Sequence, residues 1–288
     1  MTLNRILQQT TEILSISHIE DAHLEARILV GRGLKKTPVE LYTEIEHSLT
    51  QQEIEDVQQL VEHRLRGEPT AYITNHKEFY GIDFYVDHRV LIPRPETELL
   101  VEEALKFARS YRESSIDSTS ILTVADIGTG CGNIAISLAL NISNIKVYAV
   151  DISSSALEVA SLNCTHYKVT DRVTLLQGNL LDPITESVDL IIANLPYIAT
   201  SELAKLRPEI YYFEPKVALD GGKEGSDQIH QLIRQASEKI HHPCHLLLEI
   251  GAYQEQAVTT IAKRYLPSAV FKCISDLNNI KRVIEITN

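Results

Sequence analysis

Four residues, Asn194, Leu195, Pro196 and Tyr197, directly follow an apolar run at 188–193 that is typical of a buried strand. The Asn194 side-chain oxygen and the Leu195 backbone carbonyl can accept both hydrogens of a planar NH₂ group. These acceptors would orient a weakly nucleophilic nitrogen and support the positive charge that it gains on alkylation. The Tyr197 ring can stack on the same group and stabilise that charge. The tetrapeptide therefore predicts a site that prepares an amide or amine nitrogen to attack an electrophilic carbon.

A glycine-rich loop follows another apolar run, at 121–127. Its candidate ligand-binding residues are Asp126, Gly128, Thr129, Gly130, Cys131 and Gly132. Glycines let a ligand approach the backbone, and the N-terminus of the next helix offers unpaired N–H groups. A dinucleotide fingerprint needs a small residue at its last position, where this chain has Asn133. The pattern D-x-G-x-G-x-G instead resembles the first motif of S-adenosylmethionine-dependent enzymes.

Two more polar residues follow predicted strands. Asp151 ends the apolar run at 145–151, a position where a carboxylate accepts hydrogen bonds from ribose hydroxyls. Asn179 follows the run at 173–178 and can meet an adenine edge. Ligands bind at the carboxyl ends of parallel strands, so these residues and Asn194 should share one cavity. We therefore predict that the chain binds S-adenosylmethionine and releases S-adenosylhomocysteine, with Asn194 bordering the methyl donor.

The elements that must position these residues alternate between strands and helices. The buried-strand runs lie at 121–128, 145–152, 173–179, 188–196 and 245–251. Helical segments separate most of them, which predicts a doubly wound, mostly parallel α/β sheet. Two further runs, 269–276 and 281–287, are too close for a parallel crossover and must pair as an antiparallel C-terminal hairpin. The predicted fold is therefore the seven-stranded sheet of the S-adenosylmethionine methyltransferases, with a small N-terminal helical domain.

The region before the sheet divides into two parts. Residues 1–70 have apolar residues at helical spacing, and Thr50 and Glu53 have the spacing of a capping box. Residues 71–92 are rich in aromatic and β-branched residues around a glycine, which predicts a β-hairpin linker. Residues 93–288 are then the methyltransferase domain. Because the helical domain contains no catalytic cluster, we expect it to bind a partner or to brace the larger domain.

The composition restricts the class of the protein. Asp and Glu (39) outnumber Lys and Arg (27), a net charge of −12, whereas nucleic-acid-binding proteins usually show a basic footprint. The sequence has no apolar run long enough to span a bilayer, and its start lacks the features of a signal peptide. The cysteines, Cys131, Cys164, Cys244 and Cys273, are scattered, which predicts structural thiols and no metal site. We expect a cytoplasmic protein without a membrane or a direct nucleic-acid partner.

Several further motifs match one enzyme family. They are Ile92-Pro93-Arg94-Pro95-Glu96-Thr97-Glu98, Phe213-Glu214-Pro215, Ala218-Leu219, Gly221-Gly222, Leu248-Glu249-Ile250-Gly251 and Lys281-Arg282-Val283. With the two motifs above, they resemble the bacterial release-factor glutamine methyltransferases, the HemK/PrmC family, from about residue 64 to the end. The resemblance implies methylation of the glutamine in the Gly-Gly-Gln motif of class I peptide chain release factors, which act in translation termination. It also implies that Pro95 and Glu96 line the substrate pocket, and that the N-terminal domain helps to bind the release factor.

One residue departs from the family pattern. The amino-methyltransferase signature is Asn-Pro-Pro-Tyr, which adenine methyltransferases of DNA share, and Leu195 stands at its second position. Any residue supplies the carbonyl, and a residue before proline already favours extended geometry. Three alternatives stay open: a glutamine methyltransferase for a ribosomal protein, an adenine methyltransferase for DNA, and a non-catalytic scaffold in which Leu195 marks loss of activity. The acidic charge disfavours DNA, and the retention of Asn194 and Tyr197 disfavours the scaffold.

Overall fold

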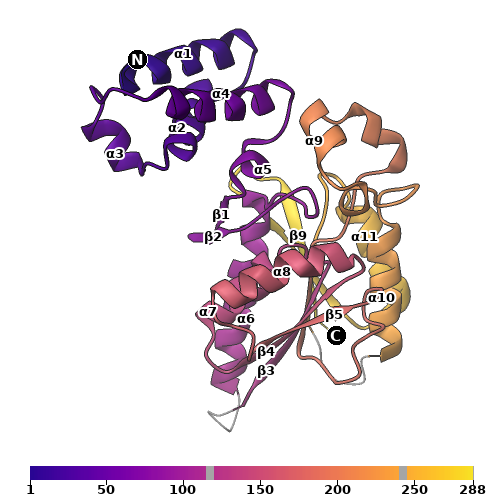
Figure 1. The fold of residues 1–288 in the computed structure, drawn as a ribbon. Coiled ribbons are helices and arrows are strands. Elements are labelled where there is room, and N and C mark those ends of the chain that lie inside the picture. The colour runs from indigo at the N-terminus through magenta and orange to yellow at the C-terminus, as the bar shows by residue number, and fades with distance from the viewer. Residues whose placement is uncertain (115–119, 240–244, 288) are drawn as a thin grey trace. The chain divides into compact units, whose positions relative to one another are not determined.

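The structure is a computed structural model that describes residues 1–114, 120–239 and 245–287. The chain forms two compact units, each with a hydrophobic core of its own. The helical unit comprises Met1–His76 and Arg207–Phe213, and the sheet unit comprises Lys77–Leu206 and Glu214–Asn288. The helical unit thus takes in a short segment that the sequence placed in the methyltransferase domain. Figure 1 labels the elements of both units.

The helical unit is built from short helices. They are α1 (Leu3–Ile16), α2 (Ala22–Leu34), α3 (Pro38–Thr43), α4 (Gln51–Leu65), α5 (Thr70–Thr74) and α9 (Pro208–Phe213). Thr50 and Glu53 form the predicted capping box at the start of α4. Gly33 in α2 lets α4 approach closely, because a Cβ there would lie 2.7 Å from the Val57 side chain. Leu29 and Val57 are fully buried where these two helices meet.

An ion cluster ties the segment 207–213 into the helical unit. Arg64 on α4 is 8% exposed and donates to Glu25 Oε2 at 2.6 Å and to Glu209 Oε2 at 3.1 Å. Burial by itself lowers the pKa of Arg64, but the two carboxylates raise it above its ordinary value. The guanidinium therefore stays charged, and removing either carboxylate would leave the buried charge of Arg64 poorly compensated.

The sheet unit contains a seven-stranded sheet in the order β5-β4-β3-β6-β7-β9-β8. The strands are β3 (Leu122–Ile127), β4 (Ile145–Asp151), β5 (Val173–Gln177), β6 (Leu190–Ala193), β7 (His245–Glu249), β8 (Val270–Ser275) and β9 (Lys281–Thr287). The first five in sequence are parallel, and β9 pairs antiparallel with both β7 and β8. This arrangement confirms the predicted fold class. The strand order reverses between β3 and β6, which lie side by side.

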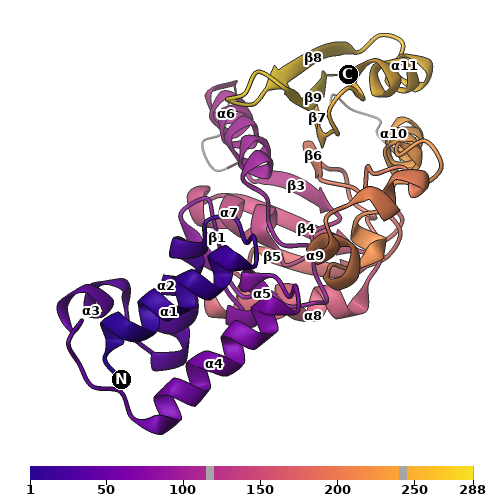
Figure 2. The same ribbon diagram turned by 90° about the horizontal axis from the view of Figure 1, so that it is seen from above.

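Helices cover both faces of the sheet, as Figures 1 and 2 show. One layer contains α6 (Glu98–Ser114), α7 (Asn133–Asn141) and α8 (Ser154–His166), and the other contains α10 (Asp227–Lys239) and α11 (Glu255–Tyr265). Right-handed crossovers that build outwards from β3 and β6 place their helices on opposite faces. Strands covered on both faces are apolar throughout, and all four residues of β6 are buried.

The predicted linker at 71–92 has three parts in the structure. Its first residues complete α5, and the hairpin itself is only β1 (Lys77–Phe79) and β2 (Ile82–Phe84), turning at Gly81. Residues 85–92 form no regular strand or helix. The 3₁₀ turn η1 (Pro95–Thr97) then leads into α6, and η2 (Thr200–Lys205) and η3 (Lys216–Ala218) flank α9 in the sequence. Among the described helices, none has the length and apolar character that crossing a membrane requires.

Candidate active site

A cavity opens at the carboxyl ends of β3, β4, β5 and β6, where the strand order reverses. Its empty volume is about 1100 Å³, part of which is open solvent. Its lining includes Gly128, Thr129, Gly130, Cys131, Asp151, Asn179, Asn194, Leu195 and Pro196. In open α/β sheets such a switch point is where ligands bind. The structure therefore brings the glycine loop and most of the Asn-Leu-Pro-Tyr motif to one cavity.

The glycine loop needs glycine for two separate reasons. Gly128, Gly130 and Gly132 have φ values of +76°, +55° and +84°, which other residues adopt only with strain. A Cβ on Gly128 would also lie 3.2 Å from the Leu195 side chain, so this glycine lets the loops after β3 and β6 meet. Nothing lies within 4 Å of a Cβ built on Gly130. The loop thus borders open space beside the N-terminus of α7, which begins directly after Gly132.

Asp126 is fully buried behind the loop and does not line the cavity. Its Oδ2 accepts hydrogen bonds from Thr129 Oγ1 at 2.6 Å and from the Ala135 N–H at 3.2 Å, which ties the loop to α7. Its Oδ1 is buried without a partner in the described part of the chain. Burial raises the pKa of Asp126 to about 7, although the Thr129 hydrogen bond lowers it. A cation in the neighbouring cavity would stabilise this buried carboxylate.

Asp151 closes the loop from the end of β4. Its Oδ2 accepts the Gly130 N–H at 2.9 Å, and its Oδ1 accepts the Ser153 N–H at 2.9 Å. Burial raises the pKa of Asp151 above its ordinary value, against the effect of these backbone hydrogen bonds. Each carboxylate oxygen has two lone pairs, so both can accept a further hydrogen bond from a ligand. Asn179 lines the same cavity after β5.

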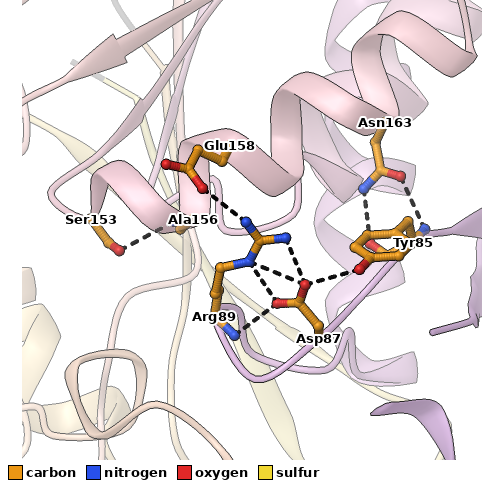
Figure 3. Close-up of polar contacts among 7 residues, drawn as sticks. All are labelled: Tyr85, Asp87, Arg89, Ser153, Ala156, Glu158 and Asn163. Atoms are coloured by element: carbon orange, nitrogen blue, oxygen red, sulfur yellow. Dashed lines mark hydrogen bonds and ion pairs between the residues drawn. The ribbon is translucent and has the colours of Figure 1, made fainter. Parts of the chain in front are cut away.

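The stretch after β2 forms one wall of the cavity, through Arg89, Val90, Leu91 and Pro93. Figure 3 shows how polar contacts hold this wall. The Arg89 guanidinium bonds with Asp87 Oδ2 at 2.6 Å, and the Asp87 carboxylate also accepts the Arg89 N–H. Asn163 on α8 donates to the carbonyls of Tyr85 and Cys131, at 3.0 and 2.9 Å. Asn163 therefore joins the wall to the glycine loop, a role that the sequence did not reveal.

Asn194 and Leu195 present their polar groups where β6 ends. Asn194 Nδ2 donates to Thr97 Oγ1 at 2.9 Å, so Thr97 holds the nitrogen end of this amide and not its oxygen. The Leu195 side chain is 5% exposed and packs in the core of the sheet unit. In the described ranges, no backbone N–H donates to the Leu195 carbonyl. Both predicted acceptors are therefore free to receive hydrogen bonds from a ligand.

Tyr197 lies outside the cavity lining, because its side chain turns toward the end of β7. Its hydroxyl is hydrogen-bonded to Glu249, and Gly251 leaves room for its ring, since a Cβ there would lie 3.1 Å from Tyr197 Cδ2. Glu249 Oε2 also accepts a hydrogen bond from Thr97 Oγ1 at 2.7 Å. Burial raises the pKa of Tyr197, and it raises the pKa of Glu249 to about 7. Thr97 and Glu249 are the site residues that sequence reasoning missed, although both belong to quoted motifs.

Gly221 and Gln254 contact the backbone of the Asn-Leu-Pro-Tyr motif. Gly221 allows close approach, because a Cβ there would lie 2.6 Å from the Pro196 carbonyl oxygen and 2.8 Å from Tyr197 Cα. Its N–H also donates to the Ile198 carbonyl at 2.8 Å. Gln254 Nε2 donates to the Tyr197 carbonyl at 2.9 Å. The Gly-Gly motif and the start of α11 thus fix the path of the chain after Asn194.

The proline-rich segment reaches the cavity through Pro93, Arg94 and Thr97. Pro95 is exposed and Glu96 is half-buried, and neither belongs to the lining. Arg94 pairs with the buried carboxylate of Glu214, which also accepts the Ile92 N–H at 3.3 Å. Glu214 therefore positions this segment at the cavity.

The described residues contain no group of three or more His, Cys, Asp or Glu side chains placed to hold a metal ion. Cys131 and Cys164 are buried free thiols, and burial raises the pKa of Cys131 to about 12. Cys273 is a third free thiol, and Cys244 lies outside the described residues.

Two protein-family models match this chain. The PrmC N-terminal domain model matches residues 5–74, and the methyltransferase small domain model matches residues 114–207. A release factor glutamine methyltransferase from Moorella thermoacetica is 38% identical over 264 residues, 91% of this chain and 90% of that protein. The chain belongs to the release factor glutamine methyltransferase family. A second member, from Rhodopirellula baltica, is 34% identical over 287 residues, 99% of this chain and 96% of that protein.

Solved structures confirm the fold of this family member. The N-terminal domain of human METTL16, solved in complex with SAH, aligns with a TM-score of 0.52 over 72% of this chain and 76% of that chain. Its sequence identity of 15% shows a shared fold alone. The chain therefore has the methyltransferase fold that its sequence motifs predicted, and its membership of the family makes it an enzyme.

Proposed function

We propose that this enzyme transfers a methyl group from S-adenosylmethionine to the side-chain amide nitrogen of the glutamine in the Gly-Gly-Gln motif of class I release factors. One observation carries the proposal. The Asn194 side chain and the Leu195 carbonyl offer two acceptors at the same cavity as the glycine loop and Asp151. A planar amide NH₂ has two hydrogens to donate, so this pair matches it. The family membership supports the same substrate.

The cavity has the groups that S-adenosylmethionine requires. The open space beside Gly130 suits the amino-acid end of the cofactor, Asp151 suits its ribose hydroxyls, and Asn179 suits the adenine edge. The cofactor is a cation at sulfur and at its amino group, which favours a site whose buried carboxylates, Asp126 and Asp151, have raised pKa values. When bound there, S-adenosylmethionine supplies an electrophilic methyl group and leaves as S-adenosylhomocysteine.

The residues of the chain orient the nitrogen that receives the methyl group. Asn194 Oδ1 and the Leu195 carbonyl each accept one N–H of the glutamine amide and so fix its plane. As positive charge grows on the nitrogen, its N–H groups become stronger donors, and both hydrogen bonds strengthen in the transition state. Once the methyl group is bound, the nitrogen releases one of its two protons to the solvent at the open side of the cavity, which restores a neutral amide. The buried Leu195 side chain, packed beside Gly128, keeps the carbonyl next to the cofactor loop.

We assign recognition of the release factor to a helical domain at residues 1–70, followed by a linker at 71–92 and a catalytic domain at 93–288. The separate family model over residues 5–74 supports this division. The net charge of −12 favours a protein partner over direct binding of nucleic acid. We place the enzyme in the cytoplasm, where release factors act.

Two alanine variants test the division of roles. Asn194→Ala should lower kcat for release factor about a hundredfold, because it removes an acceptor used most in the transition state. Asn179→Ala is the matched control, and it should raise the KM for S-adenosylmethionine and leave the kcat at saturating cofactor nearly unchanged. Steady-state kinetics with labelled cofactor measures both. Equal effects of the two variants on kcat would refute the assignment of Asn194.

A further inference from the structure

Three segments that are far apart in the sequence meet behind the asparagine of the motif. Thr97 ends the turn η1, Asn194 follows β6, and Glu249 ends β7. The three side chains form one chain of hydrogen bonds, from Asn194 Nδ2 to Thr97 Oγ1 at 2.9 Å and from Thr97 Oγ1 to Glu249 Oε2 at 2.7 Å. Thr97 and Glu249 are each 2% exposed. Both side chains are therefore shielded from bulk water.

The direction of the hydrogen bonds follows from the donors available. A threonine hydroxyl has one proton and an ionised carboxylate has none, so Thr97 must donate to an ionised Glu249. The Thr97 oxygen is then left as an acceptor, and only the nitrogen end of the Asn194 amide can satisfy it. The carbonyl oxygen of Asn194 is thereby kept for the cavity. With the amide reversed, an NH₂ group would face the NH₂ group of the substrate, and two donors do not bond.

We infer that Thr97 and Glu249 are positioning residues that hold the Asn194 side chain with its oxygen directed to the substrate nitrogen. This inference rests on the proposed function, in which Asn194 accepts a hydrogen bond from the glutamine amide. It assigns to the Pro-Glu-Thr and Leu-Glu-Ile-Gly motifs a common task that neither motif shows alone. Thr97 and Glu249 act through Asn194 and do not themselves contact the reacting atoms.

The surroundings of Glu249 keep it in place as an acceptor. Tyr197 donates a second hydrogen bond to it, and the charge of Arg282 favours the ionised form. Burial opposes ionisation most strongly, and the charge of Glu96 opposes it too. The Lys-Arg-Val motif on β9 thus contributes Arg282 to the same cluster, so four of the sequence motifs converge on one carboxylate.

The orientation of Asn194 can be measured without any substrate. In ¹⁵N-labelled full-length enzyme, the side-chain NH₂ signals of Asn194 are identified by their loss in Asn194→Ala. Thr97→Val, which keeps the shape of the side chain but lacks the hydroxyl, should shift both proton signals and speed their exchange with water. Thr97→Ser keeps the hydroxyl and should leave them nearly unchanged. Thr74→Val is the matched control, since Thr74 is also buried but donates to its own helix.

Kinetics then shows whether this orientation matters for methyl transfer. With release factor as substrate, Thr97→Val should lower kcat about tenfold, the effect of losing the neutral hydrogen bond that orients Asn194, while Thr97→Ser stays within about threefold. In the Asn194→Ala background, Thr97→Val should change kcat less than about twofold, because the residue through which it acts is gone. A cooperative thermal unfolding transition confirms that each variant is folded.

The measurements distinguish the positioning role of Thr97 from the identity of the substrate. Unchanged Asn194 signals in Thr97→Val, or a full tenfold loss added on top of Asn194→Ala, would overturn the positioning role. If the wild-type enzyme leaves release factor unmethylated while Thr97→Val still displaces the Asn194 signals, the positioning role stands and the proposed substrate is wrong.

Discussion

At the scale of single residues, the site depends on carboxylates that are buried and therefore difficult to ionise. Burial raises the pKa of both Asp126 and Glu249 to about 7, and it raises the pKa of Asp151 above its ordinary value. Each is held by hydrogen bonds from neighbouring groups that favour the charged form. Cofactor binding and catalysis should therefore respond to pH near neutrality.

Asp151 gives the most direct test of the cofactor site. Asp151→Ala removes the proposed acceptor for the ribose hydroxyls and the acceptor for the Gly130 N–H, and should weaken S-adenosylmethionine binding by about 1.5–3 kcal/mol. Calorimetry measures this change. Ser153→Ala is a suitable control, because Ser153 also lines the cavity but contacts Asp151 only through its backbone. Unchanged affinity in Asp151→Ala would remove Asp151 from the cofactor site.

Because the pKa of Glu249 is raised to about 7, we expect kcat to depend on pH. Above pH 7 the carboxylate is ionised and accepts from Thr97, whereas below pH 7 it is protonated and can donate instead, which weakens the hold on Asn194. The kcat of the wild-type enzyme should therefore fall about fivefold between pH 8 and pH 6, as a group of pKa near 7 titrates. Glu249→Gln cannot titrate, but its side-chain oxygen still accepts from Thr97. Its kcat should vary less over this range, and identical profiles for the two enzymes would exclude Glu249 as the titrating group.

The residues that sequence reasoning found share one property. Asp151, Asn179 and Asn194 lie at or just after the carboxyl ends of strands, so the rule for ligand sites in open sheets places them without knowledge of side-chain packing. Thr97 and Glu249 stand in equally visible motifs, but their role depends on contacts between η1, β6 and β7. Nothing in their local sequence shows which polar group each one meets.

At the scale of elements, Gly221 in the loop after η3 determines where the Asn-Leu-Pro-Tyr motif can lie. Gly221→Ala would place a methyl group 2.6 Å from the Pro196 carbonyl oxygen, so the motif or the loop must move. We expect a loss of about 1–3 kcal/mol in the free energy of unfolding and a fall in kcat of at least about tenfold. Thermal unfolding and steady-state kinetics measure the two effects.

Gly81→Ala is the control for Gly221→Ala, because it strains the backbone without displacing a neighbouring residue. Gly81 turns the chain at a positive φ, +71°, which Gly221 does not, and nothing lies within 4 Å of a Cβ built there. The Gly81→Ala variant should lose about 1 kcal/mol in the free energy of unfolding because of backbone strain, and its kcat should be unchanged. If Gly221→Ala also kept its kcat, the close approach of Gly221 to the motif would have no bearing on catalysis.

The sheet could be predicted because its signals are local. Strands covered on both faces are apolar throughout, and the short connection before β9 allows only an antiparallel hairpin. The segments at 85–93 and 207–213 could not be placed in this way. The first is held at the cavity by Asn163, and the second joins the helical unit through Arg64. Both placements depend on partners more than 70 residues away in the sequence.

At the scale of the whole molecule, the two units should contribute to different kinetic constants. Removing residues 1–70 should leave S-adenosylmethionine binding within about twofold, because every group proposed to hold the cofactor belongs to the sheet unit. It should raise the KM for intact release factor at least about tenfold, since lost uniform binding appears in KM. Calorimetry and steady-state kinetics test the two statements.

The deletion also strips the segment 207–213 of its partner Arg64. Glu209→Gln in the full-length enzyme is therefore the matched control, because it weakens the ion pairs of Glu209 with Arg64 and Arg207 and keeps the helical domain. Its KM for release factor should rise much less than that of the deletion. If Glu209→Gln reproduced the whole effect, the helical domain would act by holding this segment and not by recognising the partner.

The identity of the substrate is tested most directly by mass spectrometry of a purified class I release factor after incubation with the wild-type enzyme and S-adenosylmethionine. We predict a single added methyl group on the glutamine of the Gly-Gly-Gln tripeptide, absent without cofactor and strongly reduced with Asn194→Ala. An unmodified tripeptide, with methyl transfer instead to a ribosomal protein or to adenine in DNA, would contradict the proposed function.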